Sequence, residues 1–100
     1  MKKSSLVIKY VNLFTGDVKF KTHEGYTFTA LTSDNMSVDL FVFKEENGTW
    51  DATEPQSTTN VSKADTRKQA VALAQSRIGA RTFEEFNRAI ERAKEVKGDC

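Results

Sequence analysis

The spacing of apolar residues changes once along the chain, near Ser62. Before that point apolar and polar side chains tend to alternate, as they do in β-strands with one face in the core. After it apolar residues recur at the intervals typical of amphipathic helices, and no strand-helix-strand unit is repeated. This order predicts an α+β fold, with an antiparallel sheet of about five strands followed by two C-terminal α-helices.

The strand region is divided by short turn signals. The run Leu6 to Phe14 is almost continuously apolar, which predicts a strand covered on both faces or central in the sheet. Thr15-Gly16-Asp17 and Glu24-Gly25 are typical turn sequences, and Asn47-Gly48 favours a type I′ hairpin. We therefore expect strands over about residues 6–54, ending before Pro55, with a short further strand around residues 60–62.

Two helix starts carry the same local signature. Thr66 is followed by Gln69 and Thr82 by Glu85, each pair forming a capping box that satisfies free N–H groups. We expect helices over about residues 66–78 and 83–97. Gly79 and Gly98 are predicted to end them, Gly79 in the left-handed conformation. The second helix carries an apolar stripe formed by Phe83, Phe86, Ile90 and Ala93. The methylene stem of Lys97 can extend this stripe.

Composition predicts one folded domain spanning residues 1–100. Hydrophobic residues make up 38% and charged residues 29% of the chain, an ordinary globular balance. The net charge is only +1, although residues 62–100 hold nine Lys and Arg against six acidic residues. This small excess on the predicted helices is typical of a solvated surface and does not by itself indicate nucleic-acid binding.

Few residues are suited to catalysis or to metal binding. Cys100 is the only cysteine and His23 the only histidine, so we expect a reducing, cytoplasmic location, no metal site and no cofactor. His23 next to Glu24 is the one candidate general base, and its place before a turn signal favours an exposed residue instead. The apolar run that follows Lys2 and Lys3 is too short for a signal peptide or a membrane span. We therefore expect a protein that is not an enzyme and does not contact a membrane.

Aromatic residues suggest a binding surface. Phe41 and Phe43 alternate with Leu40 and Val42, so both faces of this strand carry large apolar groups. If helices cover one face, the two phenylalanines are candidates for contact with a protein partner. The alternative is that the N-terminal strand or the curl of the sheet covers them. Arg88 and Arg92 are candidate contacts on the second helix, where they could also bind the phosphates of a nucleic acid.

One segment resembles a known family. The stretch from Gly48 to Ile78 is similar to the hairpin-to-helix portion of HicB-type antitoxins, through Pro55, Asp65, Thr66, Ala70 and Ala74. The chain departs from the family pattern at Ser57-Thr58-Thr59 and at Ala64, and it continues into a second helix instead of another strand. The resemblance implies a local fold and does not extend to binding of a toxin.

We therefore expect a non-catalytic binding or regulatory module that acts on a protein partner, similar in size and composition to phage or mobile-element accessory proteins. The alternative is a nucleic-acid-binding module that uses the arginines of the helices.

Overall fold

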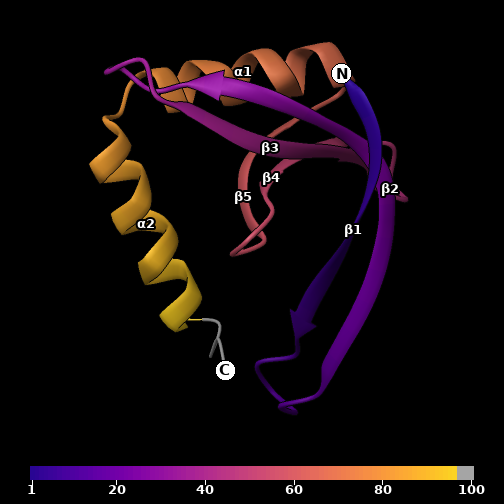
Figure 1. Cartoon of the computed structure of the whole chain (residues 1–100). Helices are drawn as coiled ribbons and strands as arrows, with labels where there is room; N and C mark the ends of the chain where they lie inside the picture. The colour runs from indigo at the N-terminus through magenta and orange to yellow at the C-terminus, as the bar shows by residue number, and fades with distance from the viewer. Residues whose placement is uncertain (97–100) are drawn as a thin grey trace.

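A computed structural model describes residues 1–96 and shows a five-stranded antiparallel sheet followed by two helices (Figure 1). The strand order is β1-β2-β3-β4-β5, so every strand pairs with its neighbour in sequence. The elements are β1 (Lys2–Val11), β2 (Val18–Leu31), β3 (Ser37–Lys44), β4 (Trp50–Glu54), β5 (Thr59–Ala64), α1 (Arg67–Gly79) and α2 (Phe83–Val96). The predicted α+β class is confirmed. No helix in this part of the chain is long and apolar enough to cross a membrane.

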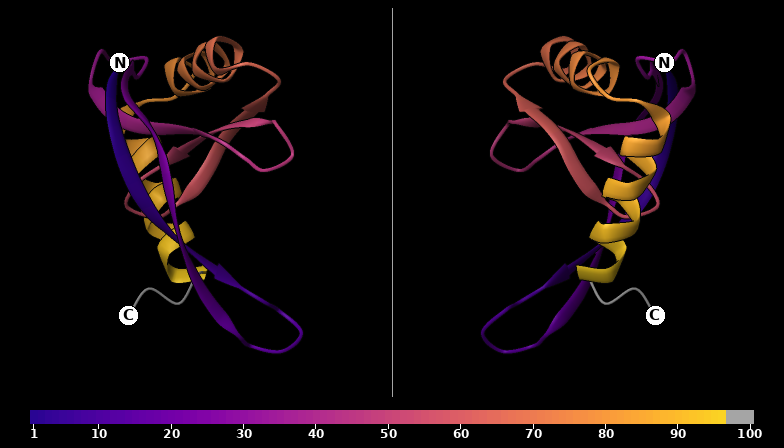
Figure 2. Two further views of the ribbon diagram at one scale, coloured as in Figure 1. Left: turned by 90° about the vertical axis from the view of Figure 1, so that its right-hand side faces the viewer. Right: turned by 90° about the vertical axis from the view of Figure 1, so that its left-hand side faces the viewer.

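The first two strands differ most from the sequence-based expectation. β1 is an edge strand and not a central one, and most of its residues are exposed. β2 runs through Glu24-Gly25 without a turn, so the two strands predicted on either side of this dipeptide are one. Together β1 and β2 form a long hairpin whose tip extends beyond both helices (Figure 2).

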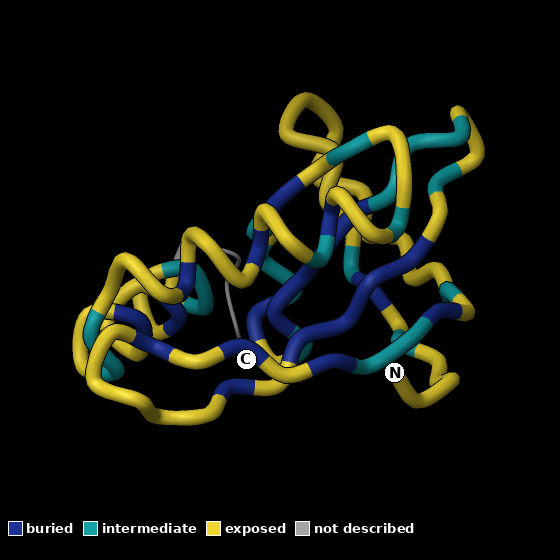
Figure 3. Tube along the Cα trace, turned by 90° about the horizontal axis from the view of Figure 1, so that it is seen from above, coloured by how far each residue is buried: buried dark blue, intermediate teal, exposed yellow. Residues whose placement is uncertain are grey.

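The main core lies between one face of the sheet and the two helices. α1 contributes Ala70, Ala74 and Ile78, whose burial recurs along the helix trace as the helical period requires (Figure 3). The small side chains let α1 approach the sheet closely enough for the buried Ser62 hydroxyl to donate to the Ala70 carbonyl at 2.7 Å. The sheet residues of this core are Phe28, Ala30, Val38, Leu40, Val42 and Ala52.

A second, smaller core lies on the opposite face, which the helices do not cover. Ile8 of β1 packs there against Phe41 and Phe43 of β3, with Leu6 partly buried beside them. Gly25 makes this packing geometrically feasible, because a Cβ at that position would lie 2.1 Å from the Val42 carbonyl oxygen and 2.9 Å from Cζ of Phe41. The glycine predicted to form a turn therefore serves a close approach of β2 to β3.

The hairpin predicted at Asn47-Gly48 is present with a different turn. Gly48 has a φ of 91°, whereas Asn47 does not have a positive φ. The Gly48 N–H donates to the Glu45 carbonyl at 2.9 Å and the Glu45 N–H to the Thr49 carbonyl at 2.8 Å. This is a three-residue loop that ends in a left-handed glycine, not a type I′ turn, and it needs only one residue with positive φ. The predicted end of a strand before Pro55 and the extra strand around residues 60–62 are confirmed by β4 and β5.

Both helices begin after the predicted threonines, but only the second has the complete capping box. The Thr66 hydroxyl accepts a hydrogen bond from the Gln69 N–H at 3.2 Å. Thr82 and Glu85 form both halves of a capping box, with the Glu85 N–H on the Thr82 hydroxyl and the Thr82 N–H on the Glu85 carboxylate. Gly79 differs from the prediction, because it is the last residue of α1 and Ala80 forms the cap in the right-handed region.

A contact distant in sequence fixes the start of α2. The Asp34 carboxylate, in the turn between β2 and β3, accepts a hydrogen bond from the Phe83 N–H at 3.0 Å. The Thr32 hydroxyl also donates to this carboxylate, at 2.5 Å, and the two bonds lower the pKa of Asp34. From this anchored end Phe86 and Ile90 reach the main core, with Phe83 partly buried, as the apolar stripe predicted. Lys97 and Gly98, which are predicted to extend the stripe and to end the helix, lie outside the described residues.

Candidate functional site

The two phenylalanines proposed from the sequence as partner contacts are buried. Phe41 is 1% exposed and Phe43 is 2% exposed. The ring centroids of the pair are 5.8 Å apart, and the His23 ring lies over Phe43 at 4.2 Å. The expectation that these rings lie on a surface is therefore corrected: the curl of the hairpin places Leu6 and Ile8 over them, so a partner cannot reach them in this structure.

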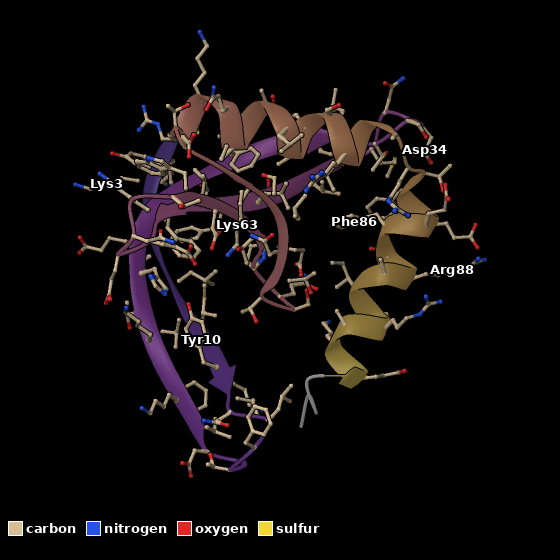
Figure 4. All side chains as sticks on the ribbon, turned by 180° about the vertical axis from the view of Figure 1, so that it is seen from behind. Lys3, Tyr10, Asp34, Lys63, Phe86 and Arg88 are labelled. Carbon is tan, nitrogen blue, oxygen red and sulfur yellow. The ribbon has the colours of Figure 1, made fainter. Side chains whose placement is uncertain are left out.

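The two arginines proposed from the sequence are exposed on α2, with acidic residues among them. Arg88 is directed away from the sheet, on the side of the helix opposite Phe86 (Figure 4). Its guanidinium is 2.6 Å from the carboxylate of Glu84, one helical turn earlier. Arg92 shares a shallow hollow with Arg88, Glu91 and Glu95. The structure thus brings the two arginines together but surrounds them with carboxylates, which weakens their attraction for phosphate.

Most of the exposed large apolar side chains lie on the β1–β2 hairpin. Phe14 is fully exposed, Leu13 is 92% exposed and Phe20 is 69% exposed. We call this surface the hairpin patch, and it consists of Val7, Tyr10, Val11, Leu13, Phe14, Val18 and Phe20. A side chain such as Phe gains roughly 1.5 to 3 kcal/mol on full burial, so several such side chains left in water on one hairpin mark it as suited to contact with another molecule.

Strand register places four members of the patch on one face. Val7, Val11, Val18 and Phe20 share the face that carries the main core further along the sheet, because β1 and β2 pair Val11 with Val18 and Lys9 with Phe20. Val7 and Phe20 share a hollow with Lys94 of α2 and with residues 56–58 of the turn between β4 and β5, and the tip of the hairpin extends past both helices (Figure 1). These four residues therefore extend the core face of the sheet and stay 43–69% exposed, although the end of α2 lies beside two of them.

The tip of the hairpin is held by hydrogen bonds. The Asn12 side-chain oxygen accepts from the Phe14 N–H at 2.9 Å and from the Thr15 N–H at 3.3 Å. The Asn12 N–H donates to the Asp17 carbonyl, and Gly16 closes the loop with a φ of 76°. These bonds define a loop conformation in which Leu13 and Phe14 point into solvent, so a partner would meet a preformed tip.

A polar cluster lies next to the smaller core, at the base of the hairpin. The Tyr10 hydroxyl and Nε2 of His23 are hydrogen-bonded at 2.9 Å. Burial, followed by the charge of Lys21, lowers the pKa of His23, and burial raises the pKa of Tyr10. The neighbouring Lys21 is paired with Glu46 at 2.6 Å, which joins the hairpin to the turn between β3 and β4. These contacts fix the base of the hairpin against the rest of the sheet.

The same cluster holds a carboxylic acid that titrates near neutrality. Asp51 is 5% exposed, and burial together with the nearby Glu45 raises its pKa to about 7. The Lys63 ammonium lies 3.8 Å from Asp51 and 3.6 Å from Glu45, and Asn60 donates to Asp51 at 3.2 Å. The arrangement can therefore bind or release a proton near neutral pH. Within residues 1–96 no group of three or more His, Cys, Asp or Glu is placed to hold a metal ion.

Sequence reasoning did not identify the hairpin patch. The apolar run from Leu6 to Phe14 predicts a buried strand, because continuous apolar sequence is typical of central strands. The signal that could have shown otherwise is the position of Leu13 and Phe14 directly before Thr15-Gly16-Asp17, since large apolar residues at a turn lie on the surface.

Comparisons of this chain with protein-family models, with curated proteins and with solved structures found no match.

Proposed function

We propose that the chain is a non-catalytic binding module that contacts a protein partner through the hairpin patch. The observation that carries the proposal is the exposure of Leu13 and Phe14 on a loop ordered by Asn12. Aromatic residues dominate the binding energy of protein interfaces, and a preformed loop loses little conformational entropy when it binds. The single cysteine, Cys100, supports a cytoplasmic location for this module.

The experiment compares two variants in affinity capture from the source cell. The variant Leu13→Ser with Phe14→Ser removes the apolar tip, and Leu73→Ser is a matched control, because Leu73 is an exposed apolar residue of α1 at 37%. All three side chains are exposed, so thermal unfolding is expected to stay close to that of the original chain. The original chain and Leu73→Ser should recover one dominant protein, and the tip variant should lose it.

Titration of the recovered protein against the original chain and the tip variant measures the loss of affinity. Removal of a central aromatic contact worth about 2 kcal/mol weakens binding by roughly thirtyfold. Equal affinity of the tip variant and the original chain, or recovery of no protein by the original chain, would contradict the proposal.

Nucleic-acid binding through Arg88 and Arg92 is the alternative function. Both side chains are exposed on α2, which supports it, while the ion pair of Arg88 with Glu84 opposes it. Electrophoretic shifts with single- and double-stranded DNA and RNA at low salt test it. A shift that is lost in Arg88→Glu with Arg92→Glu would favour this alternative over a protein partner.

A further inference from the structure

The two edges of the sheet differ in how far they are protected. β5 is the short edge, and its register against β4 shifts between Ala52 and Thr53. Side chains already occupy two of its carbonyls, because Arg77 donates to the Val61 carbonyl and Asn60 donates to the Ser62 carbonyl. A short, irregular and occupied edge does not accept another strand readily. β5 is therefore closed to further pairing.

β1 is the open edge. It pairs with β2 over its whole length of 10 residues without a bulge, from Lys2 opposite Thr27 to Val11 opposite Val18. In an antiparallel sheet alternate residues of an edge strand direct their N–H and C=O groups away from the neighbouring strand. In the described part of the chain the one side-chain hydrogen bond to the β1 backbone is from Thr27 to the Lys2 carbonyl. In the left view of Figure 2, β1 forms a margin of the sheet.

The side chains of β1 indicate which residues a strand added to this edge should contain. Lys3, Val7, Lys9 and Val11 share one face, and Val7 and Val11 are 54% and 43% exposed. Lys3 points outward from the sheet (Figure 4), and within residues 1–96 neither Lys3 nor Lys9 has a salt bridge. β1 contains no acidic residue. Directly opposed charges and β-branched pairs stabilise neighbouring strands, so the complementary strand is acidic and β-branched.

A second copy of this chain fits the edge less well. Two β1 strands side by side would place the lysines of both copies, at positions 2, 3 and 9, along one seam without a carboxylate. Like charges on adjacent strands are destabilising, and lysine on an edge is a common means of preventing self-association. The charge of the edge therefore selects a different, acidic strand.

We propose that β1 receives an extended segment of the protein partner as an added antiparallel strand, with acidic side chains facing Lys3 and Lys9 and β-branched side chains facing Val7 and Val11. This inference rests on the proposed function and names the chemistry of the partner. The hairpin patch and the β1 edge are contiguous, so one partner can contact the tip with a pocket and the edge with a strand.

The experiment uses two synthetic peptides of the length of β1 and the full chain. In the first, Val faces Val7 and Val11 and Glu faces Lys3 and Lys9; in the second, Lys replaces both Glu residues. We expect the acidic peptide to bind about tenfold or more tightly than the basic one, since two pairs change from attraction to repulsion. The preference should reverse for the variant Lys3→Glu with Lys9→Glu, and it should shrink at high salt. Amide NMR shifts caused by the acidic peptide should map to β1.

Several results would overturn the inference. They are equal binding of the two peptides, absence of binding by the acidic peptide at millimolar concentration, an unchanged preference in the charge-reversed variant, and shifts confined to another element. A dimer of the free chain in sedimentation that the charge-reversed variant alters would assign the edge to a second copy instead. If the captured protein is lost with the tip variant but retained at full affinity by Lys3→Glu with Lys9→Glu, this inference fails while the proposed function stands.

Discussion

Replacing Gly25 by alanine tests how the smaller core is built. The new Cβ would lie 2.1 Å from the Val42 carbonyl oxygen, 2.9 Å from Cζ of Phe41 and 3.0 Å from Cβ of Phe43. The nearest atom is backbone, so a change of side-chain rotamer cannot relieve the contact. To restore an ordinary separation, β2 and β3 must move apart by roughly 1 Å, which weakens their hydrogen bonds at the end of the ladder where Gly25 pairs with Phe43.

The magnitude follows from these contacts. Overpacking of a dense core costs about 1 to 3 kcal/mol, and each ladder hydrogen bond that is lost costs about 1 kcal/mol. The lower entropy of the unfolded alanine chain offsets about 0.4 to 1 kcal/mol of this. We therefore expect Gly25→Ala to lower the free energy of unfolding by about 2 to 4 kcal/mol, a large part of the 5 to 15 kcal/mol typical of a domain.

Urea denaturation followed by far-ultraviolet circular dichroism measures this loss, with Gly79→Ala as the matched control. Gly79 is the last residue of α1, has a negative φ, and its added Cβ would meet only the Leu31 carbonyl oxygen, at the ordinary distance of 3.6 Å. Alanine there should leave stability unchanged or raise it by up to about 1 kcal/mol. A loss below about 0.5 kcal/mol for Gly25→Ala, or equal losses for both variants, would refute the close-approach argument.

Two further predictions concern the main core and the polar cluster. Truncating the buried Phe86 to alanine should lower the free energy of unfolding by about 3 to 5 kcal/mol, whereas Arg88→Ala, on the exposed side of α2, should change it by less than about 0.5 kcal/mol; similar small effects in urea denaturation would show that α2 does not anchor the fold. The raised pKa of Asp51, about 7 in the folded protein, means that the folded state binds this proton more tightly than the unfolded state. Its contribution to stability is therefore greatest below the unfolded pKa near 3.8 and is lost as the pH rises to about 7. Measured from pH 4 to pH 8, the stability of Asp51→Asn relative to the original chain should rise with pH, and a flat difference would contradict the assignment.

The sequence predicts the features that depend on near neighbours in the chain. The N-cap threonines Thr66 and Thr82 and the end of a strand before Pro55 are encoded within a few residues, and the structure contains them. The place of β1 at an edge could not be predicted in this way, because it depends on which strands pair. The burial of Phe41 and Phe43 could not be predicted from the sequence either, since it results from the curl that brings Ile8 over them. Gly25 shows the ambiguity directly: the same residue type suits a turn and a close approach of two strands.

The sequential order of the strands has a consequence for how the chain is made. Each strand pairs with the one before it, so the sheet can grow in the order in which the ribosome releases the chain. Its core face, however, is closed by Ala70, Ala74 and Ile78, which are synthesised after all five strands. A nascent chain that ends before α1 therefore exposes Phe28, Leu40 and Val42 to solvent. Stalled or truncated translation products of this length should be aggregation-prone, while completion of α1 removes the hazard.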